Sequence, residues 1–181
     1  FGNNDRPGVM TANAGRAYLN RFAVQPGENI VVATNNDSAY APAFDLASSG
    51  AEIVILDSRK TVPGTLRSLC EADDIQLRLD SGPAKVLGGK GVSGLQLAQR
   101  YAGGWQSSDC IDCDLILVSG GWSPVVNLLS HRGIKPIWNS ELACFLAPAC
   151  EEALLTAGSA AGIWAHEGCV DSGRNAATQA L

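Results

Sequence analysis

The sequence predicts an α/β protein whose parallel sheet is flanked by helices and carries a small antiparallel meander. Two apolar runs, residues 30–33 (IVVA) and 53–56 (IVIL), are continuous rather than alternating, as in central parallel strands that are buried on both faces. Between them lie a polar turn and a segment whose apolar residues recur at helical spacing. A strand, turn, helix and strand in this order form half of a Rossmann-like dinucleotide fold.

The helices of this region have recognisable ends. Residues 11–23 (TANAGRAYLNRFA) predict a lead-in helix that ends before Pro26 and Gly27. In the helix between the two strands, Ser38 is the predicted N-cap and Gly50 lies just beyond the last turn.

The turn after the first strand is a candidate nucleotide site. It carries Asn35, Asn36, Asp37 and Ser38 where nucleotide-binding proteins usually place GxGxxG, so its backbone approaches a pyrophosphate less easily. Asp57, at the end of the second strand, is placed to accept hydrogen bonds from a ribose diol. The alternative is that Asp57 is a solvated turn residue with no ligand.

Further along, the pattern predicts a helix over 62–72, a strand that begins near Ile75, and an antiparallel meander within 84–101. A buried strand (LILVS) then runs into the sharp turn GGWSP at 120–124, where we expect a domain boundary. Beyond it, a short helix at 125–129, a strand at 136–138 flanked by proline and a further segment at 142–147 do not repeat the first half.

The last segment is a second candidate site. Residues 154–162 predict a strand that leads into a turn of small residues, and a helix over 166–180 follows. Small residues at Gly158, Ser159, Ala160 and Gly162 would let the backbone lie against a bound cofactor. Tight packing between a helix and a strand would require small residues equally.

Composition excludes several classes of partner. Lys and Arg total 13 against 18 Asp and Glu, and no basic run is present, so neither nucleic acid nor an anionic membrane is an expected partner. The sequence has no apolar run long enough to cross a bilayer and no secretion signal at its start, so we expect a cytoplasmic protein. The missing initiator Met suggests a piece of a longer chain.

The six cysteines are expected to be reduced and mostly buried. Cys110 and Cys113 form a CxxC motif, but zinc would need two more ligands, and a redox pair usually opens a helix whereas this one leads into a strand. His131 and His166 stand in no triad or metal pattern, so we expect both at the surface. No metal site is predicted.

Four segments resemble the alpha subunits of heterotetrameric sarcosine oxidase, which belong to the disulfide-reductase-like FAD/NAD(P)-binding superfamily. They are NDRPGVM (4–10), AYLNRF (17–22), TNNDSAY (34–40) and LVSGGWSPVVNL (117–128). The last two are much more specific than a lone glycine motif, and together the four span most of the chain.

The resemblance implies a nested arrangement, in which one nucleotide-binding module is interrupted by another. Residues 1–28 would then be a lead-in helix and linker, 29–121 an inserted half-Rossmann domain with a meander, and 122–181 a return segment that completes the first module. The family's N-terminal GxGxxG module is missing from this sequence. The segment from Gly158 to Trp164 would line the edge of an NAD site in that module.

The resemblance also implies where the chemistry takes place. In this family the amine is oxidised at a flavin on the beta subunit, and electrons pass to FMN at the interface of alpha and beta. We therefore expect NAD in the full alpha subunit, FAD and FMN in the assembled complex, the beta subunit and further subunits as partners, and no catalytic residue in this chain.

Three functions remain open. The first is an NAD-associated, non-catalytic module of a sarcosine-oxidase-like enzyme. The second is a self-contained flavin-linked reductase that uses Cys110 and Cys113 as its redox pair. The third is a ligand-free Rossmann-like scaffold that holds partner subunits, which the missing glycines favour.

Overall fold

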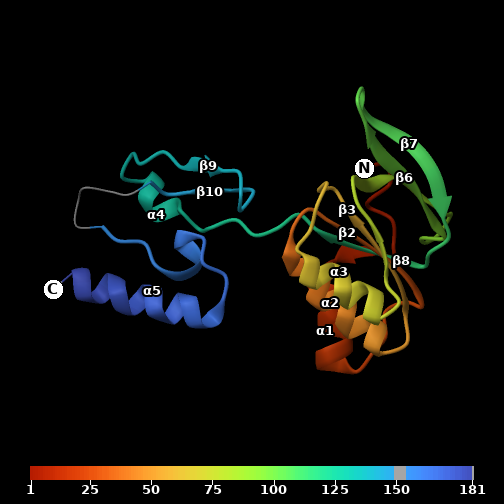
Figure 1. The fold of residues 1–181 in the computed structure, drawn as a ribbon, viewed down its shortest axis with the longest axis horizontal. Helices are drawn as coiled ribbons and strands as arrows, with labels where there is room; N and C mark the ends of the chain where they lie inside the picture. Colours follow the sequence, from red (N-terminus) through yellow and green to blue (C-terminus); the bar gives the residue numbers. More distant parts are fainter. Residues whose placement is uncertain (149–153, 181) are drawn as a thin grey trace. The chain divides into compact units, whose positions relative to one another are not determined.

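A computed structural model of the protein describes residues 1–148 and 154–180 (Figure 1). The chain divides into two compact units, Phe1–Gly120 and Gly121–Leu181. Residues 1–28, predicted as a lead-in helix and linker, lie in the first unit. The assignment of residues 122–181 as a return segment stays a prediction.

The first unit is built on a five-stranded parallel sheet with the strand order β1-β8-β2-β3-β4. The strands are β1 (Val9–Thr11), β2 (Asn29–Thr34), β3 (Glu52–Asp57), β4 (Gln76–Arg78) and β8 (Leu115–Ser119). Although β8 comes last in the sequence, it lies between β1 and β2. The predicted parallel sheet is confirmed.

Helices cover one face of this sheet and a meander covers the other (Figure 1). The helices are α1 (Ala12–Phe22), α2 (Tyr40–Ser48) and α3 (Gly64–Ala72). The meander consists of β5 (Ser81–Leu87), β6 (Gly94–Tyr101) and β7 (Gly104–Ile111), paired antiparallel in this order. The predicted α/β fold with an antiparallel meander is therefore confirmed, with one strand, β7, lying beyond the predicted range.

The central strands send alternate side chains into two separate cores. In β2, Ile30 and Val32 pack with Leu46 in the core beneath the helices, whereas Val31 packs with Leu95 in the core beneath the meander. Because both faces are buried, every position of such a strand favours an apolar residue. This is why the two runs in the sequence are continuous.

Polar residues gather at the carboxyl ends of the parallel strands. Thr34, the last residue of β2, is in register with Ser119 at the end of β8 and with Asp57 at the end of β3. Ligands of open α/β sheets bind outside this edge. The fold therefore places both the predicted turn site and Asp57 where a ligand is expected.

The second unit has little regular structure. It contains α4 (Asn127–Ser130), β9 (Ile137–Asn139), β10 (Cys144–Leu146), the 3₁₀ helix η2 (Gly158–Ala161) and α5 (His166–Gln179). β9 and β10 pair with each other as an antiparallel hairpin. The strand predicted before the small-residue turn is wrong, because residues 154–157 pair with no strand among the described residues and lead directly into η2. In residues 1–148 and 154–180, no helix has the length and apolar character to cross a bilayer.

The cysteines of the described segments are free thiols. Cys70, Cys113 and Cys144 are buried, Cys110 is exposed, Cys169 is half-buried, and Cys150 lies outside the described residues. The two halves of the CxxC motif thus have different surroundings, since Cys113 belongs to the core beneath the meander and Cys110 faces solvent.

We predict unequal effects of serine at these two cysteines. Cys113→Ser places a hydroxyl in an apolar core and should lower the free energy of unfolding by about 1–2 kcal/mol. Cys110→Ser should change it by less than about 0.5 kcal/mol, because the side chain is exposed. Urea denaturation of both variants measures the difference, and equal losses would contradict the placement of Cys113 in the core.

Candidate functional site

The turn between β2 and α2 is closed by its own side chains. The Asn36 Oδ1 accepts hydrogen bonds from the Ser38 backbone N–H (3.0 Å) and from the Ser38 hydroxyl (2.5 Å). The Asn36 amide nitrogen lies 2.8 Å from Asn35 Oδ1, 3.3 Å from Thr34 Oγ1 and 3.3 Å from the Ser119 carbonyl oxygen. One side chain therefore joins the ends of β2 and β8 to the start of the next helix.

The prediction that Ser38 caps the helix is wrong, because Asn36 has this role. Asn36 is in an extended conformation (φ −155°) and caps the 3₁₀ helix η1 (Asp37–Ala39), which continues into α2. An asparagine side chain readily reaches the backbone N–H two residues ahead. In a dinucleotide module such N–H groups face the pyrophosphate. Here the N–H of Ser38 already has an acceptor.

Asp57 is fully buried at the adjoining end of β3. Its Oδ2 accepts from the Tyr40 hydroxyl (2.9 Å) and from the Arg59 guanidinium (2.8 Å). Its Oδ1 accepts from the backbone N–H and from Nε of Arg59, both at 3.0 Å. The alternative of a solvated turn residue is therefore wrong. A ribose-binding role stays a prediction, although both oxygens already have donors within the protein.

Arg59 joins Asp57 to the turn. Its guanidinium also lies 2.8 Å from Asp37, whose side chain is 55% exposed. Hydrogen bonding to Asp57 raises the pKa of Arg59, and burial together with the Asp57 carboxylate raises the pKa of Tyr40, so both remain protonated donors. The predicted site residues of the first unit thus fall into two bonded groups at the same edge of the sheet: Asn35, Asn36 and Ser38 in one, and Asp37 and Asp57, joined through Arg59, in the other.

The small residues of the second segment lie together within the second unit. Gly162 is buried in the left-handed region (φ +79°), and a Cβ there would lie 2.7 Å from Leu146 Cδ2. Gly158 also has a positive φ of +58°, and its N–H donates to Ser172 Oγ (3.2 Å). Turn geometry and packing thus account for both glycines without a ligand.

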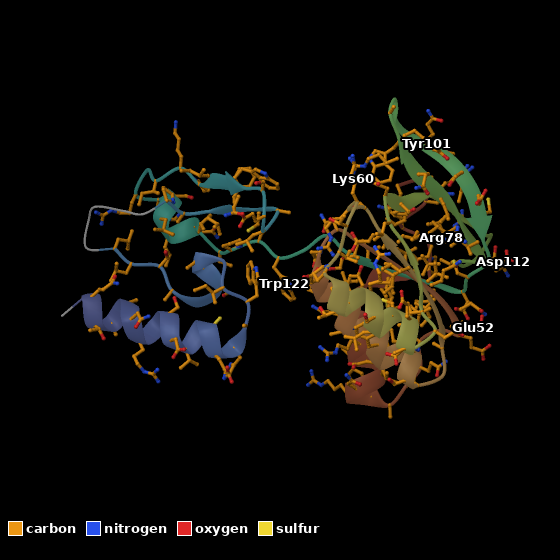
Figure 2. All side chains as sticks on the ribbon, in the orientation of Figure 1. Glu52, Lys60, Arg78, Tyr101, Asp112 and Trp122 are labelled. Atoms are coloured by element: carbon orange, nitrogen blue, oxygen red, sulfur yellow. The ribbon has the colours of Figure 1, made fainter. Side chains whose placement is uncertain are left out.

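The other members of this set are more accessible. Ser159 and Trp164 are exposed, and the Trp164 ring centroid lies 6.2 Å from that of Trp122, which is labelled in Figure 2. A hollow of about 340 Å³ lies against α5, and it is lined by residues that include Thr156, Asp171, Ser172 and Asn175. None of Gly158, Ser159, Ala160, Gly162 and Trp164 lines it.

The remaining candidates have no catalytic geometry. Burial and the nearby Asp114 and Asp112 carboxylates raise the pKa of the Cys113 thiol to about 11, whereas redox cysteines need a lowered pKa. His131 and His166 are exposed. No cluster of three or more His, Cys, Asp or Glu side chains suited to a metal ion occurs in residues 1–148 and 154–180.

Sequence reasoning missed a groove beside the end of β3. The groove has a volume of about 460 Å³ and is lined by Ser58, Gly82, Pro83, Ala84, Ala98, Trp105, Gln106 and Ser107. The predicted meander ended at residue 101, so Trp105 of β7 was not placed opposite Arg100 of β6, its partner in register. The sequence did carry a signal for this hairpin: Gly103 and Gly104 form a GG turn with polar and aromatic residues on both sides.

We predict that removal of the Asn36 side chain destabilises the first unit. Asn36→Ala leaves the Ser38 N–H without its acceptor and should cost about 1–2 kcal/mol of unfolding free energy. The matched control is Asn35→Ala, which removes one acceptor of the Asn36 side-chain amide and should lower the free energy of unfolding by less than about 0.5 kcal/mol. Chemical denaturation of both variants measures the two free energies of unfolding. An Asn36→Ala variant as stable as the unaltered protein would contradict the assignment of the cap.

Asp57 and Asp37 both pair with Arg59, and their asparagine variants form a second matched comparison. Asp57→Asn removes a fully buried charge that accepts from Arg59 and should cost about 3 kcal/mol, at the lower end for a broken buried pair because Arg59 is partly exposed. Asp37→Asn breaks an ion pair at the surface and should cost less than about 1 kcal/mol. Urea titrations that rank the two in the opposite order would overturn this account.

Comparison with solved structures places the fold among flavoprotein reductases. Thioredoxin reductase of T. acidophilum matches with a TM-score of 0.66 at 14% sequence identity, over 93% of this chain and 55% of that chain. Thioredoxin reductase of Lactococcus lactis matches with a TM-score of 0.65 at 18% identity, over 96% and 57%. At these identities the comparison shows the fold alone, and it confirms the predicted Rossmann-like FAD/NAD(P)-binding fold.

Comparison with curated sequences is more specific, although no protein-family model matches the chain. Sarcosine oxidase subunit alpha of Rhizobium meliloti (strain 1021) is 37% identical over 174 residues, and that of Corynebacterium sp. (strain P-1) is 35% identical over 178 residues. Each match covers 96% of this chain but only 17% and 18% of the relatives' own length. Over the stretch that they share, the resemblance found in the sequence is confirmed, and the chain is similar to less than a fifth of the length of sarcosine oxidase alpha subunits.

Proposed function

We propose that the chain is an NAD-associated, non-catalytic module of the alpha subunit of a sarcosine-oxidase-like complex. The observation that carries this proposal is the 35–37% identity to sarcosine oxidase alpha subunits, which for the two longest matches extends over 96% of the chain. The complex would demethylate sarcosine or a related secondary amine oxidatively on the flavin of its beta subunit. FAD and FMN would belong to the assembled complex, and NAD to the full alpha subunit.

The hydrogen bonds of the first unit argue against a nucleotide at its turn. Asn36 occupies the N–H of Ser38, and Tyr40 and Arg59 occupy both oxygens of Asp57. A pyrophosphate or ribose would have to displace these internal contacts. We therefore assign NAD to the segment from Gly158 to Trp164, in a site whose remaining walls come from parts of the subunit outside this sequence.

The surface of the second unit supports a role in assembly. Its buried residues, among those that the structure describes, are Pro124, Leu129, Cys144 and Gly162. Large apolar side chains are instead exposed, among them Leu128 (80%), Val125 (74%) and Ile137 (60%). Contiguous apolar surface marks interaction sites, and we propose that these side chains contribute to one. The proposed partners are the rest of the alpha subunit, the beta subunit and further subunits.

A cytoplasmic location belongs to the same proposal. Free thiols are typical of proteins in a reducing compartment, and the five described cysteines are all free.

A ligand-free scaffold is the second candidate function, and the closed turn between β2 and α2 favours it. A protein of this kind would keep the sheet and its partner surfaces while the nucleotide is absent. The self-contained reductase that uses Cys110 and Cys113 has less support, because the raised pKa of Cys113 keeps its thiol protonated at neutral pH.

The NAD assignment is tested best at Ser159. Gly162 is unsuitable because valine there would collide with Leu146 whether or not a ligand binds. Because Ser159 is exposed on η2, Ser159→Leu should leave folding intact while obstructing a nucleotide against η2. In the assembled complex we expect at least a tenfold weaker affinity for NAD, about 1.4 kcal/mol. Amine oxidation should persist.

The measurement is the NAD released per purified complex and its dissociation constant, with Ser159→Ala as the matched control. The control should retain full NAD. A Ser159→Leu complex that retains NAD with unchanged affinity would remove this segment from the site. A wild-type complex that carries no NAD would favour the scaffold.

A further inference from the structure

The groove beside the end of β3 is open, in contrast to the closed turn beside it. Its floor consists of small residues, Gly82, Pro83, Ala84 and Ala98, from β5 and β6. Trp105 of β7 forms one wall and is 46% exposed. Its volume of about 460 Å³ lies within the range of small-molecule sites. A planar group could therefore enter beside the indole.

Trp105 is held in place by its neighbours. The guanidinium carbon of Arg100 lies 4.6 Å from the Trp105 ring centroid. Arg100 is fixed in turn by a hydrogen bond to the Ser58 carbonyl oxygen (3.2 Å) and by the Asp80 carboxylate, 3.4 Å from Nε. The aromatic wall is thus positioned before any ligand binds, which lowers the entropic cost of binding.

The polar groups of the groove are neutral. Ser58, Gln106 and Ser107 contribute two hydroxyls and one amide that can donate as well as accept. Such groups suit the edge of a heteroaromatic ring, whereas a carboxylate or phosphate would need positive charge in the lining. An aromatic wall, a floor of small residues and a neutral hydrogen-bonding rim are together the features that recognise a nucleobase.

We propose that this groove binds a nucleobase, which stacks on Trp105 and forms hydrogen bonds with the rim. The groove shares no lining residue with the turn of Asn35–Ser38 or with the segment of Gly158–Trp164, so the proposal does not depend on the proposed NAD site. The groove lies beside the carboxyl end of β3, on the side of the meander, whereas Asn36 and Arg59 make their contacts at the turn after β2.

The test is a titration of the 181-residue chain with adenosine, followed by NMR of the indole N–H groups. The Trp105 signal is identified by its loss in Trp105→Phe. We expect adenosine to shift this signal in a saturable manner, and Trp105→Ala to weaken binding at least tenfold. Tyr101→Ala is the matched control, since Tyr101 is an exposed aromatic residue of the same meander that does not line the groove (Figure 2).

Two further arms keep the test decisive. Ser107→Leu fills the groove without removing Trp105, and it should abolish the shift even if Trp105→Ala fails to fold. Ribose 5-phosphate, which lacks a base, should leave the Trp105 signal unchanged. The proposal is overturned if adenosine at about 5 mM, enough to detect a millimolar dissociation constant, leaves the Trp105 signal unmoved. It is also overturned if Ser107→Leu binds as tightly as the unaltered chain.

Discussion

The side-chain amide of Asn36 is the contact on which the carboxyl edge of the sheet depends. It accepts from the Ser38 N–H and lies within hydrogen-bonding distance of groups at the ends of β2 and β8. Arg59 completes the edge by joining Asp37 to the buried Asp57. Partly buried polar groups at a strand end must be satisfied by a ligand, by water or by the protein itself. Here the protein supplies the partners, so the Rossmann shape persists although its glycine-rich turn is absent.

The central strands were predictable because burial on both faces leaves only one pattern, a continuous apolar run, for β2 and β3. The helix cap was not predictable from the sequence, because asparagine and serine are both good N-caps. Which of Asn36 and Ser38 caps the helix depends on the φ of Asn36 and on its contact with Ser119, which comes from a strand distant in the sequence. The strand expected at residues 154–157 was wrong for a related reason. An apolar run forms a strand only where another strand lies beside it, and the sequence of the run itself does not show whether such a neighbour exists. Trp105 was missed because its site exists only when β7 pairs with β6.

The candidate residues of the two units carry different constraints. In the first unit, Asn36, Ser38 and Asp57 are polar because the sheet edge needs donors and acceptors of its own. In the second, Gly162 is a glycine because φ is positive and Leu146 leaves no space for a Cβ. Ser159 and Trp164 are exposed, so burial does not fix their identity, and they are the residues of this set at which a functional role is tested best.

The central claim, that the protein itself closes the turn after β2, is tested most directly at the backbone N–H of Ser38. Its NMR signal and its hydrogen-exchange rate report whether this donor is occupied in the absence of nucleotide. The account predicts an N–H that is protected from exchange in the free chain and whose chemical shift does not change when NAD is added. An unprotected N–H that shifts and becomes protected on addition of NAD would contradict it, and would make the turn a nucleotide site.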